Sequence, residues 1–300
     1  MQPTETYPIQ EFLNYLTFQK RYSPHTIISY QNDLSAFFDF IIVQYNYISL
    51  AEISPSIVRS WLASVKENKA SSKTINRKIS SLKSFFKYQL KNDKIKSSPM
   101  AAISSVKVSK RLPSFVEQKD IEFLLSDIEF PDTWEGKTNR LLLQIFYNTG
   151  IRLSELINLK ESQVDKSNGA IKVLGKGNKE RIIPAGNQLL NEIAAYVSDK
   201  KAMFPGYEPD VLFLNEKGKG LYSKYVYRVV KKYLGSVSTN ERKSPHILRH
   251  TFATHLTNNG ADINAVKELL GHSSLASTQV YTHNSIEKLR EVYNQSHPKS

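Results

Sequence analysis

Residues 244–255 read Ser-Pro-His-Ile-Leu-Arg-His-Thr-Phe-Ala-Thr-His, and this stretch decides how the second half of the chain folds. Serine followed by proline is typical of a helix N-cap and first helical position, so we predict a helix over residues 244–258. His246 and Arg249 are three residues apart and therefore project from one face near the helix start. Because a helix N-terminus favours anions, the stretch indicates a phosphate site.

The same stretch also has the spacing of a zinc-binding helix, with His246 and His250 four residues apart. Zinc hydrolases with this spacing carry glutamate directly after the first histidine, whereas this chain has Ile247, and no third ligand is evident. We therefore predict a site without a metal, and we interpret His250 and His255 as ordinary polar or packing residues.

Four further residues complete a set suited to phosphodiester chemistry. They are Arg152 in Thr-Gly-Ile-Arg-Leu-Ser-Glu, Lys176 in Gly-Lys-Gly-Asn-Lys-Glu-Arg, His272 in Leu-Gly-His-Ser, and Tyr281. Two arginines can each grip phosphate oxygens through two N–H groups, which suits the planar guanidinium better than an ammonium. Lysine and histidine can transfer protons, and a tyrosine can become a covalent nucleophile.

Each of these residues also has a simpler interpretation when it is taken alone. Arg152 could be a surface arginine, Lys176 a solvated lysine in a turn, and Tyr281 is one of sixteen tyrosines, for which burial in a core is the default. Glu155 could pair with Arg152, orient neighbouring groups, or only favour the helix dipole. The Gly-Lys-Gly run is too short to indicate a nucleotide-binding loop, so we expect no nucleotide cofactor.

The composition limits the class of protein. A chain of 300 residues can form two domains, and 40% hydrophobic with 23% charged residues is typical of a folded soluble protein. No apolar run approaches the roughly 18 residues needed to span a bilayer, and the N-terminus lacks the features of a secretory signal, so we expect a cytoplasmic protein. The absence of cysteine excludes disulfides, thiolate zinc sites and a cysteine nucleophile.

The charge is concentrated in one part of the chain. The net charge is +13, and residues 56–110 carry thirteen lysines and arginines against two acids, Glu67 and Asp93. The alternative is a solvated lysine face, but the shortage of compensating acids favours contact with the phosphates of a nucleic acid. Within this stretch, the basic side chains of one predicted helix fall mostly opposite its apolar stripe: Lys73, Arg77, Lys83, Lys87 and Lys91.

The first hundred residues predict a compact four-helix unit. Helices are expected over residues 11–20, 24–45, 55–69 and 72–92, two of them opening with Ser-Pro. The basic, serine-rich and proline-rich residues 94–113 predict an extended connection, and we divide the chain into a helical domain at 1–105, a linker at 106–113 and a catalytic domain at 114–300.

The second half predicts a mainly α domain with a small sheet. We expect strands over residues 171–174 and 181–184, forming a hairpin with Lys176 near its tip. The expected helices cover residues 120–126, 137–148 (ended by Gly150), 153–159, 223–234, 244–258, 262–270 and 274–281.

The order and context of these motifs resemble the tyrosine recombinase, or phage integrase, family. The match rests on Thr-Gly-Ile-Arg-Leu-Ser-Glu-Leu, Gly-Lys-Gly-Asn-Lys-Glu-Arg, Pro-His-Ile-Leu-Arg-His-Thr-Phe-Ala-Thr-His, Leu-Gly-His, and a tyrosine nine residues beyond that histidine. The length and the helical N-terminal domain with Ser-Pro-His-Thr are most similar to Xer-type site-specific recombinases. This resemblance implies a SAM-like DNA-binding domain followed by an α+β catalytic domain.

The resemblance also implies a mechanism without metal or ATP. Arg152, Arg249 and His272 would hold the scissile phosphate, His246 would position it and help accept a proton, and Lys176 would act as general acid. Tyr281 would attack the phosphate and form a 3′-phosphotyrosyl intermediate.

The implied assembly is a tetramer on two copies of a specific double-stranded DNA site, formed with itself or with a second related recombinase. It would pass through a Holliday junction and resolve chromosome dimers at a dif-like site during cell division and chromosome partition. The resemblance also implies a septal DNA translocase as a partner. The tail over residues 284–300 would dock on a neighbouring protomer, the alternative being a terminal helix that packs in cis.

Three other functions stay open at this point. A mobile-element integrase would share the chemistry, a type IB topoisomerase-like relaxase would act alone, and a non-catalytic DNA-binding protein would have no use for Tyr281 or Lys176.

Overall fold

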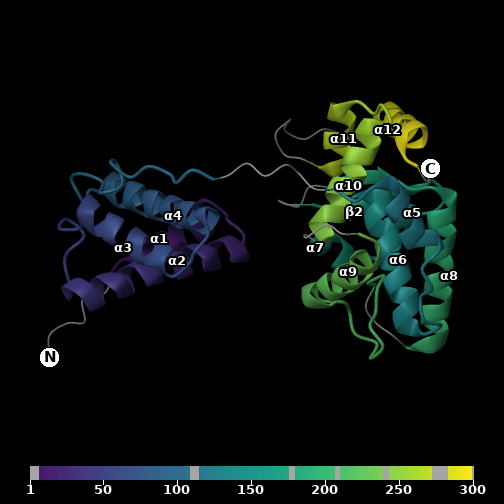
Figure 1. The fold of residues 1–300 in the computed structure, drawn as a ribbon, viewed down its shortest axis with the longest axis horizontal. Coiled ribbons are helices and arrows are strands. Elements are labelled where there is room, and N and C mark those ends of the chain that lie inside the picture. The colour runs from purple at the N-terminus through teal and green to yellow at the C-terminus, as the bar shows by residue number, and fades with distance from the viewer. Residues whose placement is uncertain are drawn as a thin grey trace. The chain divides into compact units, whose positions relative to one another are not determined.

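The computed structural model describes residues 7–108, 115–175, 180–206, 210–238, 243–271 and 283–298. The chain divides into two compact units, Met1–Arg111 and Leu112–Ser300 (Figure 1). We refer to them as the N-terminal unit and the catalytic unit. Among the described residues, no helix is both long and apolar enough to cross a membrane.

The N-terminal unit is helical, as expected. It contains α1 (Ile9–Asn14), the π-helical turn η1 (Tyr15–Gln19), α2 (Pro24–Tyr45), α3 (Pro55–Glu67) and α4 (Ser72–Lys91). A serine caps each of the three long helices: Ser23 caps α2, Ser54 caps α3 and Ser71 caps α4. Each serine side chain accepts a hydrogen bond from the backbone N–H three residues later. The helix expected over residues 11–20 is instead a short α-helix followed by the π-helical turn.

Aromatic side chains fill the core of the N-terminal unit. Phe12, Phe37, Phe85 and Phe86 are fully buried, and Trp61 meets Phe37 edge to face at 5.0 Å between ring centroids. Near the start of α4, the side chain of Asn76 donates to the Val106 carbonyl at 2.9 Å and accepts from the Val106 N–H at 2.8 Å. These two bonds hold the start of the predicted linker against α4.

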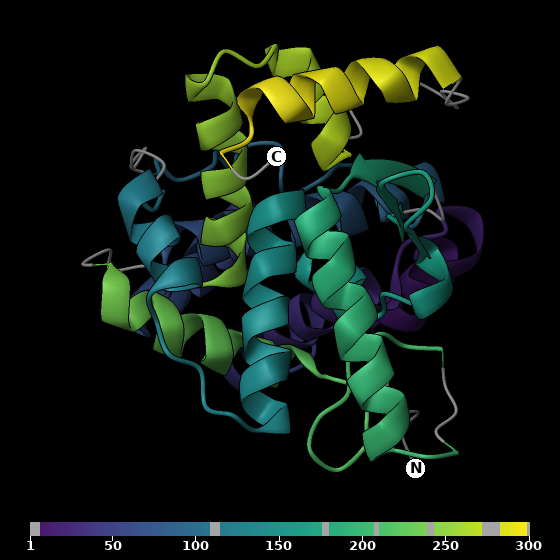
Figure 2. The same ribbon diagram turned by 90° about the vertical axis from the view of Figure 1, so that its right-hand side faces the viewer.

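The catalytic unit surrounds one long buried helix. Its helices are α5 (Gln118–Ser126), α6 (Trp134–Thr149), α7 (Leu153–Ile157), the 3-10 turn η2 (Glu161–Gln163), α8 (Asn187–Met203), α9 (Ser223–Val237), α10 (Pro245–Asn258), α11 (Ile263–Leu270) and α12 (His283–Ser296). Helix α6 packs against α8 and α10 (Figure 2), and Gly150 ends it with φ of 56°. An added Cβ at Gly150 would lie 2.4 Å from Phe252, so this turn requires glycine.

A small antiparallel sheet lies beside these helices. Its order is β1 (Val164–Asp165), β2 (Ala170–Leu174), β3 (Glu180–Pro184), and Val173 lies opposite Arg181 in the β2–β3 hairpin. The expected mainly α fold with a small sheet is therefore confirmed. Helix α8 and strand β1 were not predicted, although Leu189, Ile193 and Tyr196 have helical spacing. The helix predicted over residues 274–281 lies outside the described residues.

The described C-terminal side chains pack on their own catalytic unit. Leu289 and Tyr293 of α12 are buried, and α12 lies across α10 and α11 (Figure 2). Asn259 donates to the Ser296 carbonyl at 2.8 Å, and the ring of His297 stacks on Tyr293 with centroids 4.8 Å apart. This is the cis arrangement that the sequence left as an alternative for the tail.

Candidate active site

Arg249 is the most buried of the predicted site residues that the structure describes. It lies on α10, three residues after His246, and only 9% of its surface is exposed. Its Nη1 donates to the Gly150 carbonyl at 2.6 Å, and its Nη2 donates to the Leu270 carbonyl at 2.5 Å. Both partners are neutral backbone groups, and no carboxylate in the described part of the chain pairs with this guanidinium.

Arg152 approaches the same place from α7, where it is the N-cap residue. Its backbone N–H and its Nη1 each donate to Glu155 at 2.8 Å, and its Nη2 donates to the Gly271 carbonyl at 2.7 Å. Its side chain is 32% exposed, so part of the guanidinium can be reached by a ligand. The predicted pairing of Glu155 with Arg152 is thus the alternative that the structure supports.

Glu155 also binds a third arginine, Arg181 of β3. The Arg181 guanidinium makes a two-pronged ion pair with the Glu155 carboxylate, at 2.7 and 2.8 Å, and its Nε donates to the Leu269 carbonyl at 2.9 Å. Burial alone would raise the pKa of Glu155, but the hydrogen bonds and charge of Arg181, reinforced by Arg152, lower that pKa to about 2. Glu155 is therefore ionised at neutral pH.

Arg181 was not among the residues predicted from the sequence, although it is the last residue of Gly-Lys-Gly-Asn-Lys-Glu-Arg. Strand periodicity offered a signal, because Arg181 falls on the same face of β3 as the buried Ile183. An arginine on the inward face of a strand requires a buried acidic partner.

We name Arg152, Arg181 and Arg249 the arginine cluster. Each of them donates a hydrogen bond to a different backbone carbonyl at the end of α11. Arg152 donates to Gly271, Arg181 to Leu269 and Arg249 to Leu270. The C-terminal end of a helix carries partial negative charge and unpaired carbonyls, so it is a natural place to gather cations. The chain continues from this point directly into His272.

The arginine cluster carries more positive charge than its neighbours neutralise. Among the residues that the structure describes, three guanidiniums face one carboxylate, Glu155, which leaves a surplus of two charges. Burial, and then repulsion by Arg152 and Arg181, lowers the pKa of Arg249 to about 9, so Arg249 stays protonated at neutral pH. An anion bound beside Arg152 and Arg249 would relieve this repulsion.

The structure brings together only part of the predicted site. Arg152 and Arg249 meet at the end of α11, and His246 is exposed on the first turn of α10. Lys176, His272 and Tyr281 lie outside the described residues, so their placement stays a prediction. Strand β2 ends at Leu174 and strand β3 begins at Glu180.

The packing interpretation of His255 agrees with the structure. Its ring is buried between the Tyr147 hydroxyl, at 3.0 Å from Nδ1, and the Val116 carbonyl, at 2.9 Å from Nε2. Burial lowers the pKa of His255, so the ring is neutral at physiological pH. Within the described ranges, no three histidine, aspartate or glutamate side chains lie close enough to hold a metal ion.

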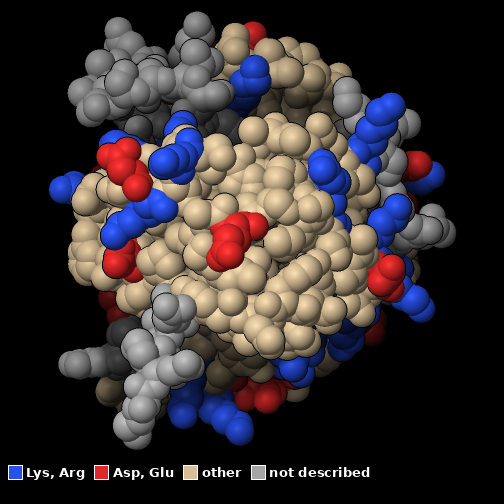
Figure 3. All heavy atoms as spheres, turned by 90° about the vertical axis from the view of Figure 1, so that its left-hand side faces the viewer, with Lys and Arg blue, Asp and Glu red and all other residues tan. Residues whose placement is uncertain are grey.

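The basic face of α4 is exposed in the N-terminal unit. All five of its predicted phosphate-contacting residues are exposed: Lys73, Arg77, Lys83, Lys87 and Lys91. Arg77 differs from the lysines because its Nη1 is held by Asp33 at 2.5 Å and by Ser29 at 2.9 Å. Figure 3 shows one face of the molecule, on which lysine and arginine lie mainly toward the edges of a surface with few charges at its centre.

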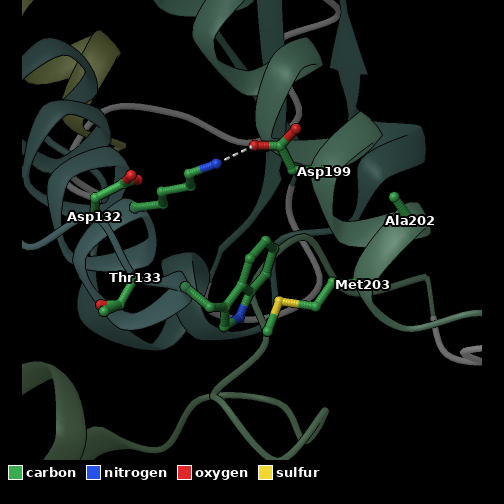
Figure 4. A pocket seen from close by; sticks show the side chains of 7 residues that line it. Asp132, Thr133, Asp199, Ala202 and Met203 are labelled. Carbon is green, nitrogen blue, oxygen red and sulfur yellow. Dashed lines mark hydrogen bonds and ion pairs between the residues drawn. The ribbon is translucent and has the colours of Figure 1, made fainter.

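A surface hollow of about 410 Å³ lies at the opposite end of α6 from Gly150 (Figure 4). Trp134 and Met203 form its apolar part, and Lys137 pairs with Asp199 at 2.7 Å beside them. None of the predicted site residues lines this hollow, so it is separate from the arginine cluster.

Comparisons with known proteins agree on one relationship. Residues 114–288 match the model of the phage integrase family, and residues 9–93 match that of the phage integrase N-terminal SAM-like domain. The chain is 38% identical to the tyrosine recombinase XerC of Thermodesulfovibrio yellowstonii, covering 97% of this chain and 96% of that protein. It is also 38% identical to XerC of Anoxybacillus flavithermus, covering 96% and 97%.

Solved structures give the same fold. One is the XerH site-specific recombinase bound to a difH substrate before cleavage, with a TM-score of 0.69 and 25% identity over 96% of this chain and 84% of that chain. Another is the Tn1549 transposon integrase in complex with transposon right end DNA, with a TM-score of 0.71 and 22% identity over 94% and 98%.

Proposed function

The chain belongs to the phage integrase family of tyrosine recombinases, and from that membership we propose that it is a Xer-type enzyme that resolves chromosome dimers at a dif-like site. Its class is that of DNA strand-transferring enzymes. Its partner is double-stranded DNA, as the structural neighbours solved with DNA support. The finer assignment to chromosome dimers follows from the relatives named XerC and from the neighbour bound to difH.

The observation that carries the chemical proposal is the surplus of two positive charges in the arginine cluster. Arg152 and Arg249 hold the scissile phosphate together with His272 and stabilise the extra negative charge of the transition state. Both guanidiniums are already held in place by backbone carbonyls, so little reorganisation is needed when the phosphate arrives.

The remaining residues supply the bond exchange. The Tyr281 oxygen attacks phosphorus while the bond from phosphorus to the 5′ oxygen breaks. His246 helps accept the phenolic proton, and Lys176 donates a proton to the departing 5′ oxygen. The products are a 3′-phosphotyrosyl link and a free 5′ hydroxyl. The reverse attack by a 5′ hydroxyl of another strand then rejoins the DNA without ATP or metal.

The proposed assembly is a tetramer on two DNA sites, in the cytoplasm, formed by this chain alone or with a second related recombinase. Exchange of residues 284–300 between protomers would couple the active sites, and α12 would then leave the cis position described above. A septal DNA translocase is the proposed activator. The helical N-terminal unit grips the duplex through the basic face of α4.

A suicide substrate tests the nucleophile. The protein is incubated with a nicked duplex bearing its site, and a covalent protein–DNA adduct is expected that is absent in Tyr281→Phe. Tyr227→Phe, at an exposed tyrosine of α9, is the matched control and should form the adduct as the native protein does. An adduct that persists in Tyr281→Phe would reject the assignment of Tyr281.

The choice of DNA site tests the biological role. A footprint on the native chromosome is expected at a single dif-like sequence, with chromosome dimers accumulating in cells that lack the protein. Protection only at the ends of a mobile element would instead assign the same chemistry to integration.

A further inference from the structure

Arg181 is a buried arginine whose contacts leave it no route to DNA. Only 4% of its surface is exposed, and each of its three nitrogens donates to a protein acceptor, two to Glu155 and one to the Leu269 carbonyl. Both Nη groups of Arg181 are held by a carboxylate, whereas those of the buried Arg249 donate only to backbone carbonyls, which a phosphate can replace. The direct role in binding phosphate is therefore assigned to Arg152 and Arg249, and the role of Arg181 must be indirect.

The position of Arg181 in the chain ties it to the predicted general acid. Arg181 lies in β3 opposite Val173 of β2, and the turn between these strands contains Lys176, five residues earlier. The main chain of Arg181 thus belongs to the base of the hairpin, while its guanidinium is fixed outside the hairpin, to α7 and to the end of α11.

One carboxylate links this hairpin to a phosphate ligand. Glu155 Oε1 accepts from Arg181 at 2.7 Å and from Arg152 at 2.8 Å. The hairpin also packs through Ile171, Val173 and Ile183, but apolar contacts are not directional and tolerate small sliding movements. The two-pronged ion pair is directional and therefore fixes where the hairpin sits relative to Arg152.

The end of α11 is shaped around the same side chain. Gly271 has φ of 63°, and an added Cβ there would lie 2.9 Å from Cδ of Arg181. The glycine lets the arginine pass close to the backbone where α11 ends. The contact is thus built from α7, β3 and the end of α11 together.

We propose that Arg181 is a positioning residue that holds the β2–β3 hairpin, and with it Lys176, in register with Arg152 for proton donation to the leaving 5′ oxygen. The inference rests on the proposed function and adds to it a residue that touches neither DNA nor the reacting atoms. Lysine at position 181 would keep the charge but lose the fork that binds Glu155 on two sides.

The test compares two substrates in single-turnover cleavage at saturating protein. One is the nicked suicide duplex, and the other has sulfur in place of the 5′-bridging oxygen, so that its thiolate leaves without protonation. Arg181→Lys should slow cleavage of the ordinary substrate on the order of 100-fold, the effect of a small misplacement of a catalytic group. On the sulfur substrate it should cleave within about threefold of the native rate, as should Lys176→Ala, because neither then needs a proton donor.

Controls separate positioning from folding. Arg140→Lys, at an exposed arginine of α6, should match the native protein on both substrates. Equal slowing of Arg181→Lys on both substrates, or no slowing on either, would overturn the proposal. If Arg181→Lys does not fold, Arg181→Gln removes the buried charge while Glu155 stays paired with Arg152, and it should show the same dependence on the substrate. If the native protein forms no adduct with either substrate, the proposed function itself fails, and this inference with it.

Discussion

Asp33 in the N-terminal unit and Glu155 in the catalytic unit are both buried carboxylates that hold two cations, yet the two clusters differ in where their positive charge is exposed. Asp33 of α2 binds Arg77, Lys78 and Ser81 of α4, and the Arg77 side chain is 47% exposed. Glu155 binds Arg152 and the buried Arg181, beside the buried Arg249.

The two clusters are suited to bind different kinds of anion. Around Asp33, two cations face one acid at the protein surface, which suits screened contact with any phosphate along a DNA backbone. Around Glu155, three guanidiniums and one acid lie largely out of water, where each charge acts more strongly. The buried surplus therefore suits one phosphate in one position.

The largest difference is expected from neutralising the two acids. Glu155→Gln leaves Arg181 buried without a counter-ion and should destabilise the catalytic unit by about 3–5 kcal/mol. Each unit has one tryptophan, so in a Trp61→Phe background urea unfolding followed by Trp134 fluorescence reports the catalytic unit alone. A loss below about 1 kcal/mol would show that the Glu155 cluster is no more dependent on its acid than a surface pair.

Acid should weaken the Glu155 cluster next. The folded-state pKa of Glu155 is about 2 against an ordinary value of 4.5, so the folded state binds this proton less readily than the unfolded state. From the size of the pKa shift, ionised Glu155 contributes about 3 kcal/mol to the free energy of unfolding. This contribution is fully present above pH 4.5 and is lost as the pH falls toward 2. Urea titrations across this range check it. Glu155→Gln should lack this component, and an identical pH dependence in that variant would contradict the prediction.

Replacing arginine by lysine should slow DNA cleavage in one cluster and weaken DNA binding in the other. Arg249→Lys keeps a charge but not the fork, and cleavage of bound DNA should slow on the order of 100-fold. Arg77→Lys should mainly weaken DNA binding, because its cluster lies at the surface. Single-turnover cleavage at saturating protein and a gel-shift titration measure the two quantities. A cleavage defect in Arg77→Lys as large as that in Arg249→Lys would remove the distinction.

The smallest effect is expected for Asp33→Asn. Water can reach Arg77 and partly reach Lys78 once the acid is neutralised, so the N-terminal unit should lose about 1–3 kcal/mol. Trp61 fluorescence in a Trp134→Phe background gives the measurement. A loss equal to that of Glu155→Gln would mean that exposure of the cations does not set the cost.

Local sequence signals predicted much of the fold. Ser-Pro at residues 23–24 and 54–55 marks helix starts because the capping bond and the restricted proline backbone act within one turn. At residues 244–245 the proline at the first helical position marks the start, and Ser244 makes no side-chain capping bond. Gly150 marked the end of α6 because glycine readily adopts the positive φ of a residue that ends a helix. Helix α8 was missed even though its apolar residues have helical spacing, because its N-cap is Gly186, which makes no side-chain capping bond.

The candidate site was less accessible because its partners are distant in the chain. Arg249 binds the Gly150 carbonyl 99 residues away, and Arg181 binds Glu155 26 residues away. The residue types suggested phosphate chemistry, but nothing in the local pattern shows which acid is shared by which arginines. The role of Glu155 stayed open for that reason, and Arg181 was not singled out.

The end of α11 determines when the free energy needed to bring three arginines together is supplied. Three backbone carbonyls at this helix end accept hydrogen bonds from the arginine cluster before any substrate is present. They act as weak internal substitutes for an anion. The repulsion between three like charges is thus overcome during folding, as part of the stability of the unit, and not during the encounter with DNA. Entry of a phosphate then exchanges one acceptor for a stronger one at donors that are already gathered.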